Sequence, residues 1–191
     1  MKPEIIETRT LFSGWTRLLS ARIRLPDGKI AVREVEDRGR AVAVLPYDAS
    51  RRTLLLVRLL RASALLAANA PDVLEAPAGM IEDEDASPED AARREVLEET
   101  GYRVGALERV GAAWTSPGLS TEKLDLFLAP YSLADRKNAG GGAAGENENI
   151  IVEEIAASQA WEMLEAGELD DLKTVTLLLF LRRRRPALFG D

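Results

Sequence analysis

Short aliphatic and β-branched runs alternate with turn sequences along most of the chain, which indicates a protein rich in strands. Between Trp15 and Glu34, two such runs flank Pro26-Asp27-Gly28, where proline presets φ and glycine tolerates positive φ. We therefore expect an N-terminal β-hairpin. Further runs of strand length occupy residues 41–48, 53–60, 110–114, 124–131 and 150–155. The segment 138–149 is rich in glycine and asparagine and is predicted to be a loop.

Three segments carry helical signals. The clearest is residues 87–100, where Ser87 suits the N-cap, Pro88 suits the first helical position and Gly101 suits the C-terminal stop. The other two predicted helices are residues 158–166 and 172–185. Strand pairs with interspersed helices, rather than regular β-α alternation, indicate a mixed α/β (α+β) fold in which helices sandwich a mixed sheet.

The length allows one compact domain with a small N-terminal addition. With 191 residues and 46% hydrophobic content, we expect a strand subdomain at residues 1–38 and a main domain at residues 39–191. No run of about eighteen apolar residues occurs, and the first residues lack the apolar middle of a signal peptide. We therefore expect a cytoplasmic protein without a membrane partner.

Two residue types are missing, and their absence restricts the chemistry. Without cysteine or histidine, the chain has no disulfides, thiol nucleophiles, imidazole bases or ordinary zinc sites. Catalysis must therefore use carboxylates, hydroxyls, lysine, arginine and hard metals. The net charge of −7 argues against a nucleic-acid partner, although an acidic enzyme can still bind phosphates through a cation.

Three glutamates share one side of the helix predicted at 87–100. Glu95, Glu98 and Glu99 stand at positions i, i+3 and i+4, where like charges repel by a few tenths of a kcal/mol per pair. A bound hard cation would reverse the sign of this interaction, and Mg²⁺ prefers such oxygen ligands. Because the triplet alone is typical of a solvated helix face, the surrounding sequence has to decide.

The sequence around the three glutamates favours the metal site over a solvated helix face. Residues 79–102 resemble the Nudix box, a glycine followed by an acid and then by R-E-U-x-E-E-x-G-U, where U is aliphatic or aromatic. The spacing from Gly79 to Arg94 is one residue longer than usual, and Ala86 stands where the box normally has its acid. Asp85 or Glu84 is the candidate substitute, because in the family this acid mainly supports the box arginine.

The resemblance to the Nudix hydrolase superfamily implies a fold, a cofactor and a set of ligands. The fold would be the Nudix-type α/β/α sandwich with an N-terminal strand subdomain, and the cofactor Mg²⁺, with Mn²⁺ as an alternative. The principal metal ligands would be Glu95 and Glu99, with Glu98 auxiliary and the Ala78 carbonyl as a further ligand. Glu98 and Glu99 are also candidate catalytic residues.

Three further motifs narrow the resemblance to one branch. Residues 114–122 resemble the S-P-G-x-x-x-E segment, and residues 33–35 the R-E-V signature, of the ADP-ribose and nucleotide-sugar pyrophosphatases. The N-A-G-G-G sequence at 138–142 and G-E-L-D-D-L-K-T at 167–174 resemble the GDP-mannose pyrophosphatase subgroup. Of the acids that follow the glycines, Glu148 is the candidate general base and fifth metal ligand, with Glu146 in reserve.

The branch resemblance also implies substrate contacts and a homodimer. Phosphates would meet two cations, the base would stack on an aromatic ring, and two residues would reach the substrate across the dimer interface through the N-terminal subdomain. The candidate substrate-binding residues are Trp15, Arg33, Glu34, Arg61, Gly79, Met80, Glu122 and Lys173. The alternatives are that Trp15 only packs in the hairpin, Arg61 only pairs with an acid and Glu122 is only solvated.

Together these features predict Mg²⁺-dependent hydrolysis of a nucleoside diphosphate sugar, of the GDP-mannose type, to a nucleoside monophosphate and a sugar phosphate. An ADP-ribose pyrophosphatase is the alternative within the same class. A non-catalytic Nudix-fold ligand sensor is the alternative from another class, and the intact glutamate triplet counts against it. A Nudix-like isoprenoid isomerase is disfavoured because its chemistry needs cysteine and histidine, and this chain has neither.

Overall fold

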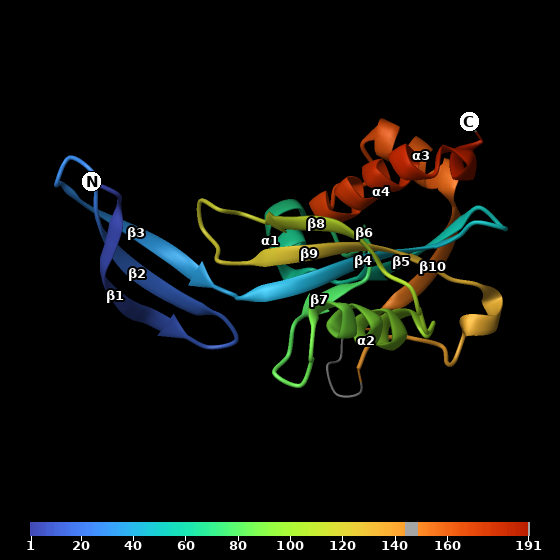
Figure 1. The fold of residues 1–191 in the computed structure, drawn as a ribbon, viewed down its shortest axis with the longest axis horizontal. Helices are drawn as coiled ribbons and strands as arrows, with labels where there is room; N and C mark the ends of the chain where they lie inside the picture. The colour runs from blue at the N-terminus through green and yellow to red at the C-terminus, as the bar shows by residue number, and fades with distance from the viewer. Residues whose placement is uncertain (144–148, 191) are drawn as a thin grey trace. The chain divides into compact units, whose positions relative to one another are not determined.

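The computed structural model describes residues 1–143 and 149–190, which form two compact units (Figure 1). The first unit joins Met1–Ala41 to Ala112–Leu124, and the second joins Val42–Gly111 to Asp125–Asp191. The predicted subdomain at residues 1–38 lies inside the first unit, which also takes in a segment from the middle of the chain.

The first unit contains a three-stranded antiparallel sheet made of β1 (Glu4–Ser13), β2 (Arg17–Arg24) and β3 (Ile30–Asp37). The predicted hairpin is β2 and β3, and at its turn Gly28 has a φ of 83° and donates its N–H to the Leu25 carbonyl at 2.9 Å. Strand β1 was not expected from the sequence. Its strand pattern is interrupted by charged residues, two of which form cross-strand ion pairs with β2.

The second unit is built on a seven-stranded mixed sheet with the order β10-β5-β4-β9-β8, while β6 pairs with β5 and β7 with β4. The strands are β4 (Arg40–Asp48), β5 (Thr53–Leu59), β6 (Val73–Glu75), β7 (Ala78–Met80), β8 (Glu108–Trp114), β9 (Lys123–Pro130) and β10 (Ile151–Ala156). The remaining elements are α1 (Ala62–Ala68), α2 (Pro88–Thr100), η1 (Leu133–Asp135), α3 (Ala157–Ala166), α4 (Leu172–Arg184) and η2 (Pro186–Phe189).

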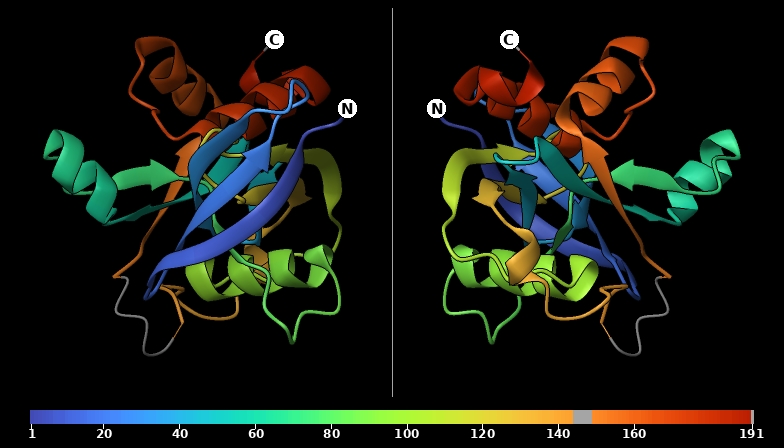
Figure 2. Two further views of the ribbon diagram at one scale, coloured as in Figure 1. Left: turned by 90° about the vertical axis from the view of Figure 1, so that its left-hand side faces the viewer. Right: turned by 90° about the vertical axis from the view of Figure 1, so that its right-hand side faces the viewer.

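Helices cover both faces of this sheet. Helix α2 lies against one face, and α3 and α4 lie against the other, as the two side views show (Figure 2). The predicted α/β/α sandwich is therefore confirmed. None of the helices in the described part of the chain is long and apolar enough to cross a membrane.

Small side chains bring α2 close to the sheet. Ala91, Ala92 and Val96 are fully buried and pack in one cluster with sheet residues that include Val44 and Phe127. Tight packing of this kind leaves a helix little freedom to shift against the sheet. The glutamates on the adjacent positions of α2 are therefore carried on a rigid element.

The caps of α2 are those expected from the sequence. The Ser87 side chain accepts a hydrogen bond from the Asp90 N–H, and Gly101 has a φ of 78° and donates its N–H to the Leu97 carbonyl. The sequence reading missed α1, β6 and β7. The two strands are three residues long, which is too short for a period to be recognised.

The turn between β4 and β5 contains a buried carboxylate with several donors. Asp48 accepts hydrogen bonds from the N–H and hydroxyl of Ser50 and from the N–H and Nε of Arg51, at 2.7 to 3.1 Å. The Arg51 guanidinium also pairs with Glu154 on β10, which ties the turn to the edge of the sheet. Burial alone would raise the pKa of Asp48, but these hydrogen bonds outweigh it and lower the pKa to about 2.

We predict that Asp48→Asn lowers the free energy of unfolding by about 2 kcal/mol at neutral pH. Because the folded-state pKa lies below the unfolded one, this stabilisation is present above about pH 4 and is lost as the pH falls through about 2. Urea unfolding at about pH 7 and about pH 3 measures the difference, with the exposed Asp83→Asn as control. An equal loss at both pH values would contradict the account.

Candidate active site

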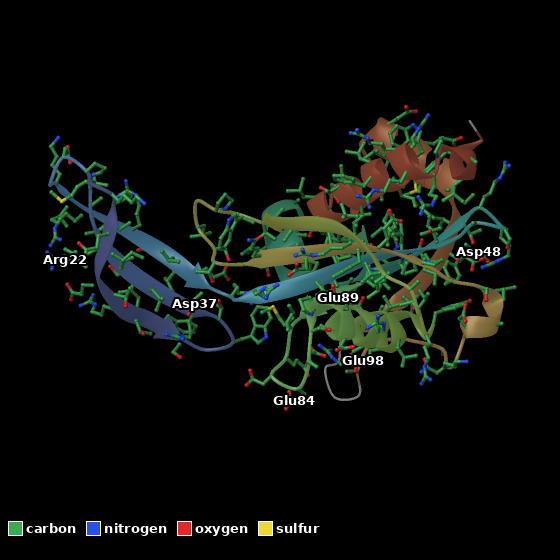
Figure 3. The ribbon with its side chains drawn as sticks, viewed as in Figure 1. Arg22, Asp37, Asp48, Glu84, Glu89 and Glu98 are labelled. Atoms are coloured by element: carbon green, nitrogen blue, oxygen red, sulfur yellow. The ribbon has the colours of Figure 1, made fainter. Side chains whose placement is uncertain are left out.

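The C-terminal half of α2 carries acidic side chains that are unusually buried for charged groups. Glu95 is 9% exposed and Glu99 is 4% exposed, while Glu98 is only half-buried. Figure 3 shows Glu98 on α2 and Glu84 on the loop that precedes the helix. Buried charges are costly unless opposite charges or hydrogen bonds offset them, so the partners of these carboxylates define the site.

Arg94 is the principal partner. Its Nη1 atom donates to Glu95 Oε1 at 2.8 Å and to Glu98 Oε2 at 3.1 Å. On the other side of the guanidinium, Asp85 accepts from Nε at 3.2 Å and from Nη2 at 2.9 Å. The hydrogen bond from Arg94 lowers the pKa of Asp85, and the same bond is the largest cause that raises the pKa of Arg94.

Asp85 therefore pairs with the box arginine in place of the acid that the Nudix box normally has at the position of Ala86. Between the two candidates that the sequence offered, Asp85 lies against Arg94 and Glu84 is exposed on the loop. The extra residue in the motif is accommodated in this loop, where the Glu82 N–H donates to Asp85 Oδ2 at 2.9 Å. The loop backbone therefore also holds the Asp85 carboxylate in place against Arg94.

The start of the motif lies directly against the carboxylates. The Ala78 N–H donates to Glu99 Oε2 at 3.2 Å, and a Cβ atom placed on Gly79 would overlap the Glu95 carboxylate. The Met80 carbonyl accepts from Arg94 Nη2 at 2.9 Å. A side chain at position 79 would therefore push the Glu95 carboxylate out of its present position.

The donor set matches a hard divalent cation. Glu95, Glu98 and Glu99 supply carboxylate oxygens, and Nη1 of Arg94 already sits as a positive centre between two of these carboxylates. Across residues 1–143 and 149–190 there is no ready-made group of three or more acidic side chains arranged to hold a metal ion. The three glutamates are the residues that would hold an ion, and their side chains would have to turn toward it.

The N-A-G-G-G segment caps the same helix. Gly141 and Gly142 donate their N–H groups to the carbonyls of Glu99 and Glu98, at 2.9 and 3.1 Å. Gly140 has a φ of 73°, and a Cβ there would overlap the backbone of Glu99 and Thr100. The last carbonyls of a helix lack partners within it, so this segment supplies them. Glu146 and Glu148, the predicted loop acids, lie outside the described residues.

A second cluster gathers the cations predicted to meet phosphates. Arg61 Nε donates to Glu75 Oε1 at 3.0 Å, and Lys173 Nζ donates to Glu75 Oε2 at 2.8 Å. Lys173 also pairs with Asp171, the N-cap of α4, at 2.9 Å. The structure thus brings Arg61 and Lys173 together around Glu75, a residue that the sequence reading missed.

A short backbone segment joins the two clusters. The Ala76 N–H donates to Thr174 Oγ1 on α4 at 2.7 Å, and the Ala78 N–H donates to Glu99 on α2. Glu75 and Ala78 are three residues apart, so their Cα atoms lie within about 11 Å of each other. The carboxylate cluster and the cation cluster are therefore neighbours.

The first unit brings two other predicted residues together. The Arg38 guanidinium lies 3.9 Å from the centre of the Trp15 ring, and its Nε atom lies 4.0 Å from Glu122 Oε1. Trp15 is 89% exposed, so this ring is not packed in the sheet. Arg33 and Glu34 are exposed on β3.

The sequence comparisons agree with this geometry. Residues 37–176 match the family pattern described as NUDIX domain. The GDP-mannose pyrophosphatase of Cronobacter sakazakii is 40% identical over 187 residues, which cover 95% of each chain. The chain belongs to the Nudix family. The GDP-mannose pyrophosphatase of Escherichia coli O1:K1 is 41% identical to it over 151 residues, covering 78% of this chain and 77% of that one.

One solved structure is also similar to most of the protein. The crystal structure of an ADP compounds hydrolase matches this chain with a TM-score of 0.78. The match covers 98% of this chain and 96% of the hydrolase chain. At 21% identity, this likeness establishes the fold alone. Because the chain belongs to this family and the relatives named above are pyrophosphatases, it is a Nudix pyrophosphohydrolase.

We predict that Asp85→Asn lowers kcat for diphosphate hydrolysis about 10-fold, because Arg94 loses the partner that orients it between the glutamates. Glu84→Gln, one residue away on the same loop, removes a charge without touching Arg94 and should leave the rate unchanged within about 2-fold. Steady-state kinetics of both variants measure this. Equal effects of the two substitutions would remove Asp85 from its assigned role.

Proposed function

We propose that this chain is a Mg²⁺-dependent hydrolase that cleaves the diphosphate bond of a nucleoside diphosphate sugar of the GDP-mannose type. The products would be a nucleoside monophosphate and a sugar 1-phosphate. The observation that carries the proposal is the juxtaposition of the α2 carboxylates with the Arg61 and Lys173 pair across a short segment. The 40% identity to a GDP-mannose pyrophosphatase supports this substrate class.

Each cluster would take one part of the diphosphate. Glu95, Glu98, Glu99 and the Ala78 carbonyl would hold the ion, which when bound neutralises charge on the phosphate oxygens and activates the attacking water. Arg61 and Lys173 would donate hydrogen bonds to the phosphates, and the backbone at Gly79 and Met80 would border the substrate. Charged donors of this type make the strongest hydrogen bonds to phosphate.

A carboxylate would remove the proton from water, in a chain that has no histidine to do so. We assign this role to Glu148, with Glu146 in reserve. Both acids follow the glycines that are anchored on α2 through the carbonyls of Glu98 and Glu99. This anchoring fixes the position of Gly142, which precedes both acids in the sequence.

The remaining candidate residues would bind the nucleoside and sugar ends. Trp15 would stack on the base, and Glu122 would contact the sugar side or the diphosphate. Arg33 and Glu34, which are exposed on β3, would reach the substrate of a partner subunit. A cytoplasmic location, expected from the sequence, is part of the same proposal.

The first experiment measures release of nucleoside monophosphate from GDP-mannose, ADP-ribose, ADP-glucose and UDP-glucose with Mg²⁺. We expect GDP-mannose to be the best substrate, and Glu99→Gln to lower kcat by at least about 100-fold, as loss of a metal ligand does. Chelation with EDTA should abolish turnover, and Mg²⁺ should restore it. Preference for ADP-ribose would move the protein to the alternative substrate.

A chain that binds one of these nucleotides tightly and hydrolyses none of them would instead be a ligand sensor. Glu165→Gln is a matched control for Glu99→Gln, because Glu165 is exposed on α3. Its rate should equal that of the wild type. A similar loss in both variants would show that the effect of Glu99→Gln is not specific to the site.

The sheet of the first unit supports a homodimer. Large apolar side chains on its strands are exposed to solvent, including Ile5, Phe12, Ile30 and Val32. A three-stranded sheet that exposes several large apolar side chains has little stability alone, so a second subunit would supply cover for them.

We predict that sedimentation equilibrium gives about twice the chain mass of 20.9 kDa. Phe12→Asp combined with Val32→Asp should shift the protein toward monomer, since charges at these positions oppose burial. Lys2→Glu is the control for a charge change in the same unit, because Lys2 is exposed just before β1, and this variant should keep the mass of the wild type. A wild-type protein that is monomeric at micromolar concentration would overturn the proposed dimer.

A further inference from the structure

One acidic residue in the cation cluster is more deeply buried than the cations around it. Glu75, the last residue of β6, is 3% exposed. Each of its oxygens accepts from a different cation: Oε1 from Arg61, through Nε and Nη2, and Oε2 from Lys173. The two cations come from positions 14 and 98 residues away in the sequence.

This arrangement brings two like charges close together. Arg61 and Lys173 would repel each other without a negative charge between them, and the Glu75 carboxylate offsets that repulsion. Asp171 also pairs with Lys173, but its second oxygen accepts from the N–H and hydroxyl of Thr174 and caps α4. Glu75 is therefore the group shared by both cations.

Exposure differs between the two cations. The Arg61 side chain is 39% exposed, whereas the Lys173 side chain is 11% exposed. The Arg61 side chain is therefore accessible from solvent, while Glu75 holds its guanidinium through Nε and Nη2. A guanidinium held in this way keeps a fixed direction, which favours phosphate binding.

We propose that Glu75 is a positioning residue that sets Arg61 and Lys173 side by side as a two-cation clamp for the diphosphate. The inference rests on the proposed function of this site. Glu75 does not serve as a metal ligand or a base in this account, because both of its oxygens are already occupied by cations. Its position three residues before Ala78 places the clamp next to the α2 carboxylates.

A contrasting ion-pair group lies on the same sheet. Arg58 on β5 is a single cation that pairs with Glu153 at 2.5 Å and with Asp72 at 2.9 Å. This group has two acids for one cation and no role in the proposed site. Glu153→Gln is therefore a matched control for Glu75→Gln: both replace a glutamate that pairs with an arginine, and only one touches the clamp.

The test uses methylenediphosphonate, a diphosphate analogue that cannot be hydrolysed at its bridge. Isothermal titration calorimetry with Mg²⁺ present gives its affinity for the wild type, Glu75→Gln and Glu153→Gln. We expect the dissociation constant to rise about 10-fold in Glu75→Gln and to stay unchanged in Glu153→Gln. The affinity for Mg²⁺ alone should be the same in all three proteins.

A double-mutant cycle separates positioning from a general effect on folding. In a background that carries both Arg61→Ala and Lys173→Ala, Glu75→Gln should cause no further loss of diphosphonate affinity. An undiminished loss in that background would overturn the clamp, and so would a wild-type affinity in folded Glu75→Gln. If Glu75→Gln does not fold, Glu75→Asp, which keeps the charge but shortens the side chain, should weaken binding at least about 3-fold.

Because the probe is not turned over, this test is independent of catalysis. An affinity change in Glu75→Gln that is absent from the double-variant background supports the clamp even if the wild type hydrolyses none of the nucleotide sugars. Absence of hydrolysis by the wild type would contradict the proposed function but not the clamp. Wild-type affinity in a folded Glu75→Asp would count against the clamp.

Discussion

Carboxylates on adjacent turns of one helix repel each other, and in this protein the Arg94 guanidinium offsets that repulsion. It bonds to Glu95 and Glu98 with one nitrogen and to Asp85 with two others. An arginine is suited to this because its planar fork presents several donors in fixed directions. The loop before α2 and the helix itself are therefore joined through one cation, and the geometry of the acidic site depends on it.

The site also depends on the short backbone segment from Glu75 to Gly79. Its N–H groups are fastened to α4 on one side and to α2 on the other, through Thr174 and Glu99. The helices belong to opposite layers of the sandwich, so the segment joins both layers at the point where the two charged clusters meet. Displacing either helix would alter the spacing between the acids and the cations.

Local signals predicted a large part of this arrangement. Ser87 and Gly101 set the ends of α2 because capping depends on side chains and φ angles near the helix itself. The family motif predicted which glutamates would hold the metal ion. The choice of Asp85 over Glu84 could not be made from sequence, since it depends on how the loop with its extra residue folds back onto Arg94.

Other features were missed because their causes are not local. Glu75 carries no motif signal of its own, and its partners lie 14 and 98 residues away in the chain. Strand β1 was missed because charged residues that pair across the sheet interrupt its hydrophobic pattern. The anchoring of Gly141 on the Glu99 carbonyl is likewise a contact between distant segments. The order of residues along the chain predicts elements and motifs. Contacts between residues far apart in the sequence become visible only in the folded structure.

The most direct test of the account is whether the acidic cluster and the cation cluster share one diphosphate. Crystals grown with Mn²⁺ and a methylene-bridged analogue of a nucleoside diphosphate sugar, studied by anomalous diffraction, would locate both the ion and the phosphonates. The account predicts a metal peak bonded to Glu95 and Glu99, with the diphosphonate contacting that ion on one side and Arg61 and Lys173 on the other. A diphosphonate bound away from either cluster, or a metal held without Glu95 and Glu99, would contradict it.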